Sequence, residues 1–114
     1  MVVTEVNQCR YCKTFHSKLA THAGVSHTEL QYYAEGQISP QTPPEEIAAL
    51  QYARRWAEHH AEMDIDNYRM LEESYDASTA TVIDLAVRLI WIGNLSGNTW
   101  DYWLYRLSFG RLGQ

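Results

Sequence analysis

Three residues near the start of the chain, Cys9, Cys12 and His16, have side chains and a spacing that could carry thiol chemistry. A cysteine attacks as its thiolate, so a reactive cysteine needs a feature that lowers its pKa from about 8.5. If a helix begins just before Cys9, capped by Asn7, its unpaired N–H groups and positive dipole end lie beside both sulfurs. His16 follows Cys12 by one helical turn, so its imidazole can serve that sulfur as a base or as a stabilising cation.

This spacing predicts a two-cysteine redox cycle. We expect Cys12 to be the nucleophile, which a peroxide oxidises to the sulfenic acid. Cys9 then acts as the resolving thiol and forms a disulfide, which an external thiol donor reduces. A pair at i and i+3 in the first turn of a helix meets the geometric requirements of a disulfide after a small adjustment.

Other interpretations of the same residues stay open. The two cysteines could be buried thiols that act as small hydrophobic side chains. They could also bind zinc together with His16 and a fourth ligand such as His22 or His27, although structural zinc sites usually contain a second close pair of ligands. A purely structural disulfide is disfavoured in a cytoplasmic protein, where thiols are kept reduced. We expect no metal and no cofactor.

Composition restricts the class of protein. The 114 residues have room for one hydrophobic core and therefore one domain over residues 1–114. An apolar content of 46%, with eight Tyr and four Trp, is enough for a packed core. The net charge of -5 and the lack of a basic stripe argue against nucleic-acid binding.

No membrane span is expected, and the predicted compartment is the cytoplasm. The longest mostly apolar stretch, residues 82–95, contains Asp84 and Arg88 and is shorter than the roughly 20 residues that a span needs. The first residues show no basic region followed by an apolar one, so no secretory signal is predicted.

The elements that must position the cysteines are predicted to be helices. A first helix over residues 5–23 puts the two cysteines and His16 on one face and stops at Gly24. Ser26 begins a capping box, which predicts a short helix to about Glu35 whose Leu30 and Tyr33 face the core. Thr42 is expected to cap a third helix that has prolines in its first turn. Its apolar residues recur at helical spacing: Ile47, Leu50, Ala53, Ala57 and Ala61.

The second half of the chain is also predicted to be helical. Asp64 or Asp66 can cap a fourth helix that ends near Tyr75, and Asp76 can cap a fifth. Residues 82–92 are apolar nearly all round, as in a helix buried in a core or between subunits. Because Gly93 and Gly97 weaken a helix, we expect a kink or two abutting helices there. No segment alternates like a strand, so the predicted fold class is all-α.

The aromatic residues are expected to form contacts between subunits. Tyr32, Tyr33, Trp91, Trp100 and Trp103 occur at helical spacing, which is typical of a core or an interface. A chain of this size would expose large apolar patches alone, so we predict a homo-oligomer.

The segment from Val6 to His16 resembles the C-x-x-C-x-x-x-H core of the alkylhydroperoxidase D-like branch of the carboxymuconolactone decarboxylase family. The order of the later segments is similar too: residues 23–26, the proline-rich step into a long helix, and residues 93–99 before an aromatic helix. The resemblance implies an alkylhydroperoxidase D-like helical bundle that forms a trimer or hexamer, with the cysteine helix near the subunit interface. It also implies peroxidase or disulfide-reducing activity, with a peroxide or disulfide substrate and a thiol reductant protein.

Two positions depart from the pattern of that family's peroxidases. Those peroxidases carry a His between the two cysteines, where this chain has Tyr11. They also carry a Glu on the helix before the motif. Glu5, one turn before Cys9, is the acidic residue that we expect to substitute in proton relay. Two other functions stay open: a lactone decarboxylase, which does not need the cysteine pair, and a non-catalytic oligomeric redox-sensing or binding protein.

Overall fold

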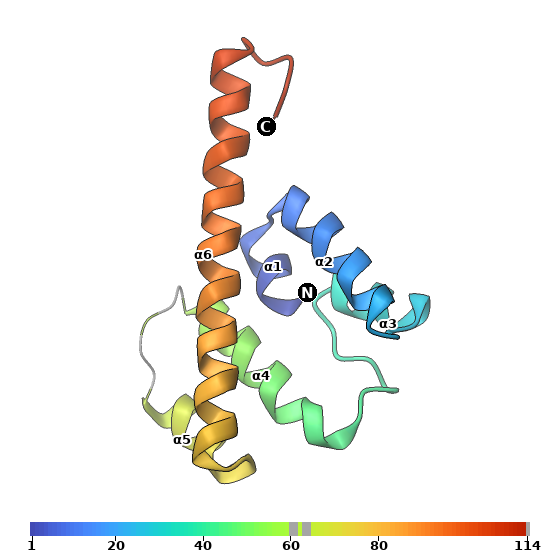
Figure 1. The fold of residues 1–114 in the computed structure, drawn as a ribbon, viewed down its shortest axis with the longest axis vertical. Helices are drawn as coiled ribbons and strands as arrows, with labels where there is room; N and C mark the ends of the chain where they lie inside the picture. The colour runs from blue at the N-terminus through green and yellow to red at the C-terminus, as the bar shows by residue number, and fades with distance from the viewer. Residues whose placement is uncertain (60–61, 63–64, 114) are drawn as a thin grey trace.

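The computed structural model describes residues 1–59, 62 and 65–113, and within these residues it contains helices and no strand. The predicted all-α class is therefore confirmed for the described part of the chain. The helices, shown in Figure 1, are α1 (Val2–Asn7), α2 (Arg10–His22), α3 (His27–Ala34), α4 (Pro44–Glu58), α5 (Ile65–Ser74) and α6 (Ala77–Leu107).

Helix α6 is the longest element, and α1, α2, α4 and α5 pack along part of it. It is one unbroken helix of 31 residues, so the predicted kink or break near Gly93 and Gly97 is wrong. Asp76 caps it as expected, because its carboxylate accepts a hydrogen bond from the Thr79 N–H at 3.1 Å. The C-terminal end of α6 extends beyond all the other helices (Figure 1).

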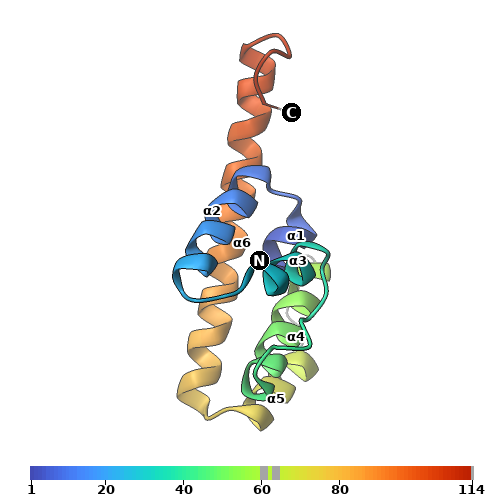
Figure 2. The same ribbon diagram turned by 90° about the vertical axis from the view of Figure 1, so that its right-hand side faces the viewer.

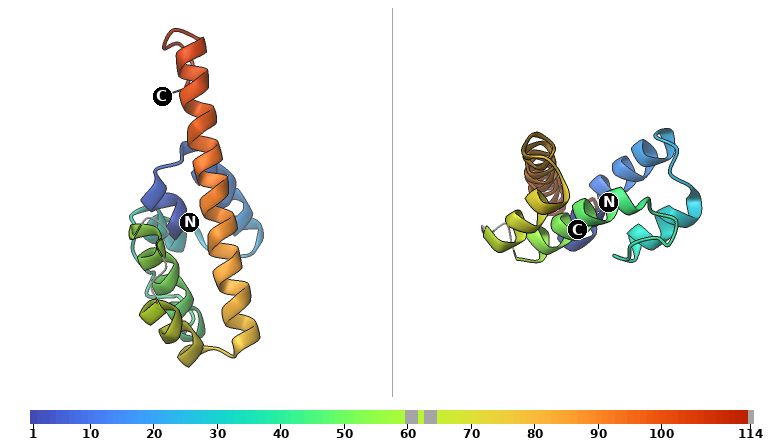
Figure 3. Two further views of the ribbon diagram at one scale, coloured as in Figure 1. Left: turned by 90° about the vertical axis from the view of Figure 1, so that its left-hand side faces the viewer. Right: turned by 90° about the horizontal axis from the view of Figure 1, so that it is seen from below.

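The short helix α1 packs between the helices α2 and α3 and the helices α4 and α6. It contacts α4 and α6 as well as α2 and α3, while α5 contacts α4 and α6. Figure 2 shows α2 beside α6, with α4 and α5 packed lower along the molecule. Seen from below in Figure 3, α6 lies at the margin of the molecule, and one of its sides faces away from the other helices.

The core lies where α1, α4, α5 and α6 meet. Trp56 on α4 packs edge-to-face against Trp91 on α6, with ring centroids 5.3 Å apart. The buried members of the core are Val3, Tyr52, Ala53, Trp56, Ala57, Leu71, Ala80 and Val87. Their helical spacing on each element explains why these segments fold as helices with one apolar face.

A polar network accommodates the two charged residues in the apolar part of α6. The Tyr52 hydroxyl donates to one oxygen of Asp84 at 2.5 Å, and Arg88 Nε donates to the other at 2.8 Å. Arg88 also lies over the ring of Trp56, 5.7 Å from its centroid. Burial, together with the hydrogen bond to Asp84, raises the pKa of Tyr52 far above its ordinary value. The network therefore joins α4 to α6.

The predicted helix boundaries are confirmed in part. Ser26 and Glu29 form the expected capping box of α3, and Leu30 and Tyr33 are buried as predicted. Thr42 does not cap α4, because Pro43 occupies the N-cap and the Thr42 hydroxyl lies 2.7 Å from the hydroxyl of Tyr33.

The fourth predicted helix corresponds to α5. Asp66 lies in its first turn rather than before it, and the helix ends at Ser74, one residue before the predicted Tyr75. Asp64, the other candidate cap, and Ala61, on the predicted third helix, lie outside the described residues.

The prediction that the aromatic residues form an interface needs a correction. Tyr33 is buried within the subunit, and Trp91 packs on Trp56, because the intramolecular core uses both rings. Trp100 and Trp103, on the projecting end of α6, are more than half exposed.

Helix α6 is long and apolar enough, by length and composition, to cross a membrane. This differs from the expectation of no membrane span, which rested on residues 82–95 being shorter than a span and containing Asp84 and Arg88. A long apolar helix that packs against protein has the same length and composition. The charged residues along α6 are Asp84, Arg88, Asp101 and Arg106.

Candidate functional site

The site begins where α1 ends and α2 starts. Gln8 adopts a left-handed conformation, with φ of 55°, and terminates α1. The predicted continuous helix over residues 5–23 is therefore wrong, and Asn7 is the last residue of α1 rather than the cap of the cysteine helix. The turn at Gln8 frees Cys9 to take the N-cap of α2.

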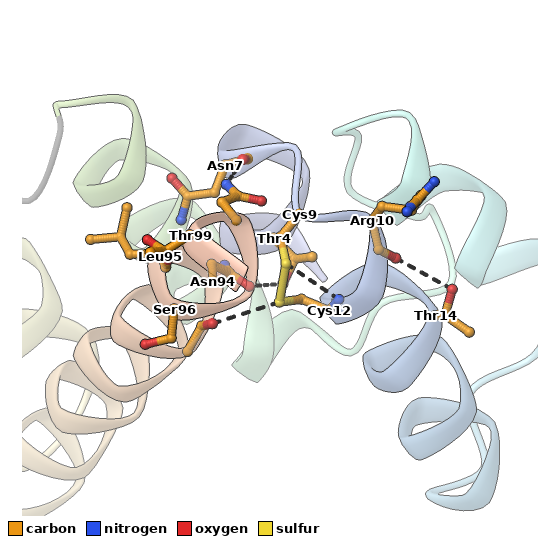
Figure 4. Close-up of a disulfide and its surroundings, with 12 residues drawn as sticks. Thr4, Asn7, Cys9, Arg10, Cys12, Thr14, Asn94, Leu95, Ser96 and Thr99 are labelled. Carbon is orange, nitrogen blue, oxygen red and sulfur yellow. Dashed lines mark hydrogen bonds between the residues drawn. A yellow bond between two sulfur atoms is a disulfide. The ribbon is translucent and has the colours of Figure 1, made fainter. Parts of the chain in front are cut away.

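The two cysteines occupy the first turn of α2 and are joined by a disulfide (Figure 4). Their Cα atoms are 5.2 Å apart, and the Cys12 N–H points at Cys9 Sγ at 3.4 Å. Cys9 is 1% exposed, whereas Cys12 is partly exposed. Both sulfurs therefore lie at the positive end of α2. Of the two residues, only Cys12 is appreciably accessible to solvent.

Two glycines of α6 face the sulfurs from the other side. A Cβ atom added at Gly97 would lie 2.7 Å from Cys9 Sγ and 3.0 Å from Cys12 Sγ, closer than van der Waals contact allows. The Gly93 carbonyl oxygen lies 3.8 Å from Cys12 Sγ. The absence of a side chain at Gly97 is thus what allows the cysteine pair to pack on α6.

Hydrogen bonds hold α1 and α2 against this face of α6. The hydroxyl of Thr4 donates to Asn94 Oδ1 at 3.2 Å, and both residues are buried. Asn98 Nδ2 donates to the carbonyl oxygen of Asn7 at 2.9 Å. Arg10, directly after Cys9, forms an ion pair with Asp101 at 3.1 Å. Thr4 and Asn7 therefore tie α1 to α6, and Arg10 ties the first residue of α2 to it.

An apolar groove opens beside Cys12. It has a volume of about 450 Å³, and its lining is Tyr11, Cys12, Phe15, His16, Leu89, Ile90 and Gly93. The groove contains both the accessible cysteine and the histidine that follows it by one turn. Burial, and then the positive charge of the N-terminal amine, lower the pKa of His16. A neutral imidazole at neutral pH favours the role of a base over that of a stabilising cation.

Glu5 is placed elsewhere than the predicted proton relay requires. Its carboxylate forms an ion pair with Lys13 Nζ at 2.9 Å, and it does not line the groove. Lys13 Nζ also donates to the Ala34 carbonyl oxygen at 3.4 Å. Lys13 thus ties α2 to α1 through Glu5 and to α3 through Ala34.

Within the described ranges, no group of three or more His, Cys, Asp and Glu side chains is arranged to hold a metal ion. His22 and His27, the fourth ligands considered for zinc, are both exposed.

The site contains residues that the sequence analysis did not assign to it: Gly93, Gly97, Thr4, Asn94 and the pair Arg10–Asp101. The glycines were noted as weak points of a helix. Their spacing of four residues, which places both on one face of one helix, was the available signal for a close contact. The polar pairs join residues about 90 positions apart in the sequence, and no local pattern indicates them.

Comparisons of this chain with protein-family models, with curated proteins and with solved structures find no match.

We predict that the two glycines of α6 respond oppositely to substitution by alanine in the oxidised protein. Gly97→Ala places a methyl group against both sulfurs and should lower the free energy of unfolding by about 1–3 kcal/mol, as overpacking does. Gly93→Ala is the matched control, because its Cβ would meet nothing within 4 Å. It should leave the free energy unchanged or raise it by up to about 1 kcal/mol, since alanine favours a helix. Urea unfolding measures both, and equal effects would contradict the close contact at Gly97.

We predict that His16 titrates below the ordinary histidine pKa of 6.5 and is neutral at pH 7. Nuclear magnetic resonance of the imidazole protons over a pH series measures this pKa, and His16→Gln assigns the signal. A midpoint above 6.5 would contradict the lowered pKa, and one above 7 would leave the imidazole mostly charged at pH 7 and remove the argument for a base.

Proposed function

We propose that this chain is a thiol-dependent peroxidase or disulfide oxidoreductase in which Cys12 reacts with the substrate and Cys9 resolves the product. The observation that carries the proposal is the asymmetry of the pair. Cys9 is 1% exposed and caps α2, whereas Cys12 opens onto an apolar groove that also contains His16. A substrate can therefore reach the sulfur of Cys12, while the sulfur of Cys9 lies buried beside it.

The peroxidase cycle balances with the residues present and an external dithiol. His16 removes the proton of the Cys12 thiol, and the thiolate attacks the outer oxygen of a hydroperoxide. The O–O bond breaks, Cys12 becomes a sulfenic acid, and the alkoxide leaves as an alcohol after taking the proton from His16. The Cys9 thiol then attacks Cys12 Sγ, which releases water and forms the disulfide. A dithiol reductant restores both thiols and is itself oxidised to a disulfide.

The surroundings of the sulfurs support thiolate chemistry at the start of α2. Unpaired backbone N–H groups at a helix N-terminus stabilise a negative charge within the first turn, where both cysteines lie. The Gly93 carbonyl oxygen, 3.8 Å from Cys12 Sγ, is available to accept a hydrogen bond from the reduced thiol. We assign no proton transfer to Glu5, since Lys13 engages its carboxylate.

We also propose that the chain belongs to the alkylhydroperoxidase D-like branch of the carboxymuconolactone decarboxylase family, with that family's helical bundle and a trimeric or hexameric assembly. The C-x-x-C-x-x-x-H motif and the order of the helices after it support this assignment. A thiol reductant protein is the proposed electron donor.

We predict that the reduced protein consumes cumene hydroperoxide in a fast phase that depends on Cys12. Cys12→Ser should abolish this phase, because it removes the nucleophile. Cys9→Ser should keep the first oxidation but stop at the sulfenic acid, which dimedone traps and mass spectrometry locates. His16→Ala should slow the fast phase by roughly 10²-fold or more, as the loss of a general base does. His22→Ala, an exposed histidine at the other end of the same helix, is the matched control and should react like the wild type.

Turnover with dithiothreitol separates the possible outcomes. Continued consumption of hydroperoxide supports an enzyme. Oxidation of both thiols once, without turnover, would replace the proposal by a redox sensor. A fast phase that survives in Cys12→Ser would contradict the assignment of the nucleophile.

A further inference from the structure

The outward side of α6 carries an apolar stripe that the described part of the chain leaves uncovered. The residues that define this outer stripe are Val82, Leu85, Leu89, Ile92, Thr99 and Trp103. Its large apolar side chains are between 55% and 63% exposed. Because apolar surface in water is unfavourable, a continuous stripe of this kind marks a contact with something else.

The stripe lies opposite the face of α6 that packs on its own subunit. The buried residues of α6 are Ala80, Val87, Asn94 and Asp101, each seven residues after the last. At 3.6 residues per turn, the outer stripe and these buried residues occupy opposite sides of the helix. Helix α6 therefore packs on its own subunit with one face and leaves the opposite face exposed. Figure 3 shows the consequence, with α6 at the margin of the molecule.

The spacing of the stripe matches a second helix. Val82, Leu85, Leu89 and Ile92 follow at steps of three, four and three, which is the repeat that lets side chains of two helices interlock. The stripe contains no charged residue. Asp84 and Arg88, which interrupt the apolar sequence, bind each other, and Asp84 also binds Tyr52 on α4.

The stripe is complementary to itself. Its N-terminal half presents protruding aliphatic side chains, while its C-terminal half contains a hollow of about 410 Å³ lined by Ile92, Leu95, Ser96, Thr99, Trp100 and Trp103. The small residue Ser96 leaves this hollow open. In a two-fold contact between identical subunits, such as joins two trimers into a hexamer, the aliphatic end of one copy meets the receiving end of the other. A lipid surface would need no such hollow.

The area is of the size that a dimer uses. Helix α6 spans roughly 46 Å at 1.5 Å per residue. Half-exposed Trp side chains contribute on the order of 100 Å² each, and the whole outer stripe with its flanking residues several hundred Å². A standard interface buries about 800 Å² on each partner. Burial of the stripe against a copy of itself therefore supplies a substantial part of that area.

We infer that the outer stripe of α6 is the contact surface for a second copy of this chain. The contact also bears on the redox site, because Leu89 belongs to the stripe and lines the groove beside Cys12. The second copy thus adds a wall at the mouth of that groove. This last consequence rests on the proposed function, whereas the contact itself does not.

Sedimentation of the full chain at micromolar concentration tests the contact. The wild type should sediment as an assembly of two or more 13.2 kDa chains. The double variant Leu85→Glu, Ile92→Glu puts charges into the stripe without touching a groove residue and should sediment as a monomer. Met70→Glu on α5 makes the same kind of change at a side chain that is 53% exposed and should sediment like the wild type. Circular dichroism establishes that the variants are folded.

A monomeric wild type would overturn the inference, whatever the variants do. A double variant that keeps the wild-type size would overturn the assignment to the outer stripe. A wild type that is monomeric and floats with phosphatidylcholine vesicles would show a lipid surface as the occupant instead.

The effect on the groove is measured separately in the reduced proteins. A bulky maleimide should alkylate Cys12 several-fold faster in the double variant than in the wild type, while small iodoacetamide should react at similar rates. Equal rates with both reagents, in a double variant that is monomeric, would overturn the added wall and leave the contact standing. The hydroperoxide reaction of the same samples reports on thiol chemistry independently of assembly.

Discussion

The close contact between the cysteine pair and Gly97 of α6 is the constraint on which the rest of the site depends. Because a side chain at that position would overlap both sulfurs, α2 can approach α6 this closely only if the residue there is a glycine. The approach buries Cys9 and leaves Cys12 at the rim, so one packing contact creates the chemical difference between two identical side chains. It also places Cys12 and His16 opposite Leu89 and Ile90, which together form the groove.

Much of the fold could be predicted from the sequence, because local signals determine helices. The capping box at Ser26 and the cap at Asp76 each satisfy backbone N–H groups within three residues, so their effect is visible in a short window. The prediction failed at Gly93 and Gly97, where intrinsic propensity suggested a break. The packing of α2 against Gly97 compensates for the low helix propensity of glycine, because tertiary contacts outweigh propensity in such cases.

Within the candidate site, the sequence predicts the relation between residues that are one helical turn apart. The relation of Cys12 to His16 follows from their spacing, and the structure places both in one groove. The relation of Cys9 to Cys12 was approximated, since the turn at Gln8 makes Cys9 a cap rather than a residue within a helix. The partners on α6 could not be predicted, because they depend on how a helix some 80 residues later is rotated. Glu5 is close to Cys9 in sequence, but its carboxylate binds Lys13. This contact depends on how α1 packs beside α2, which no local pattern indicates.

The thiol count of the fully reduced protein, after one equivalent of hydroperoxide per chain, tests the redox pair directly. We expect the count to fall from two thiols to none, and peptide mapping to find Cys9 and Cys12 joined within one chain. Two thiols that persist with the peroxide unconsumed, or a disulfide that joins different chains, would contradict a redox pair that packs against Gly93 and Gly97 of α6.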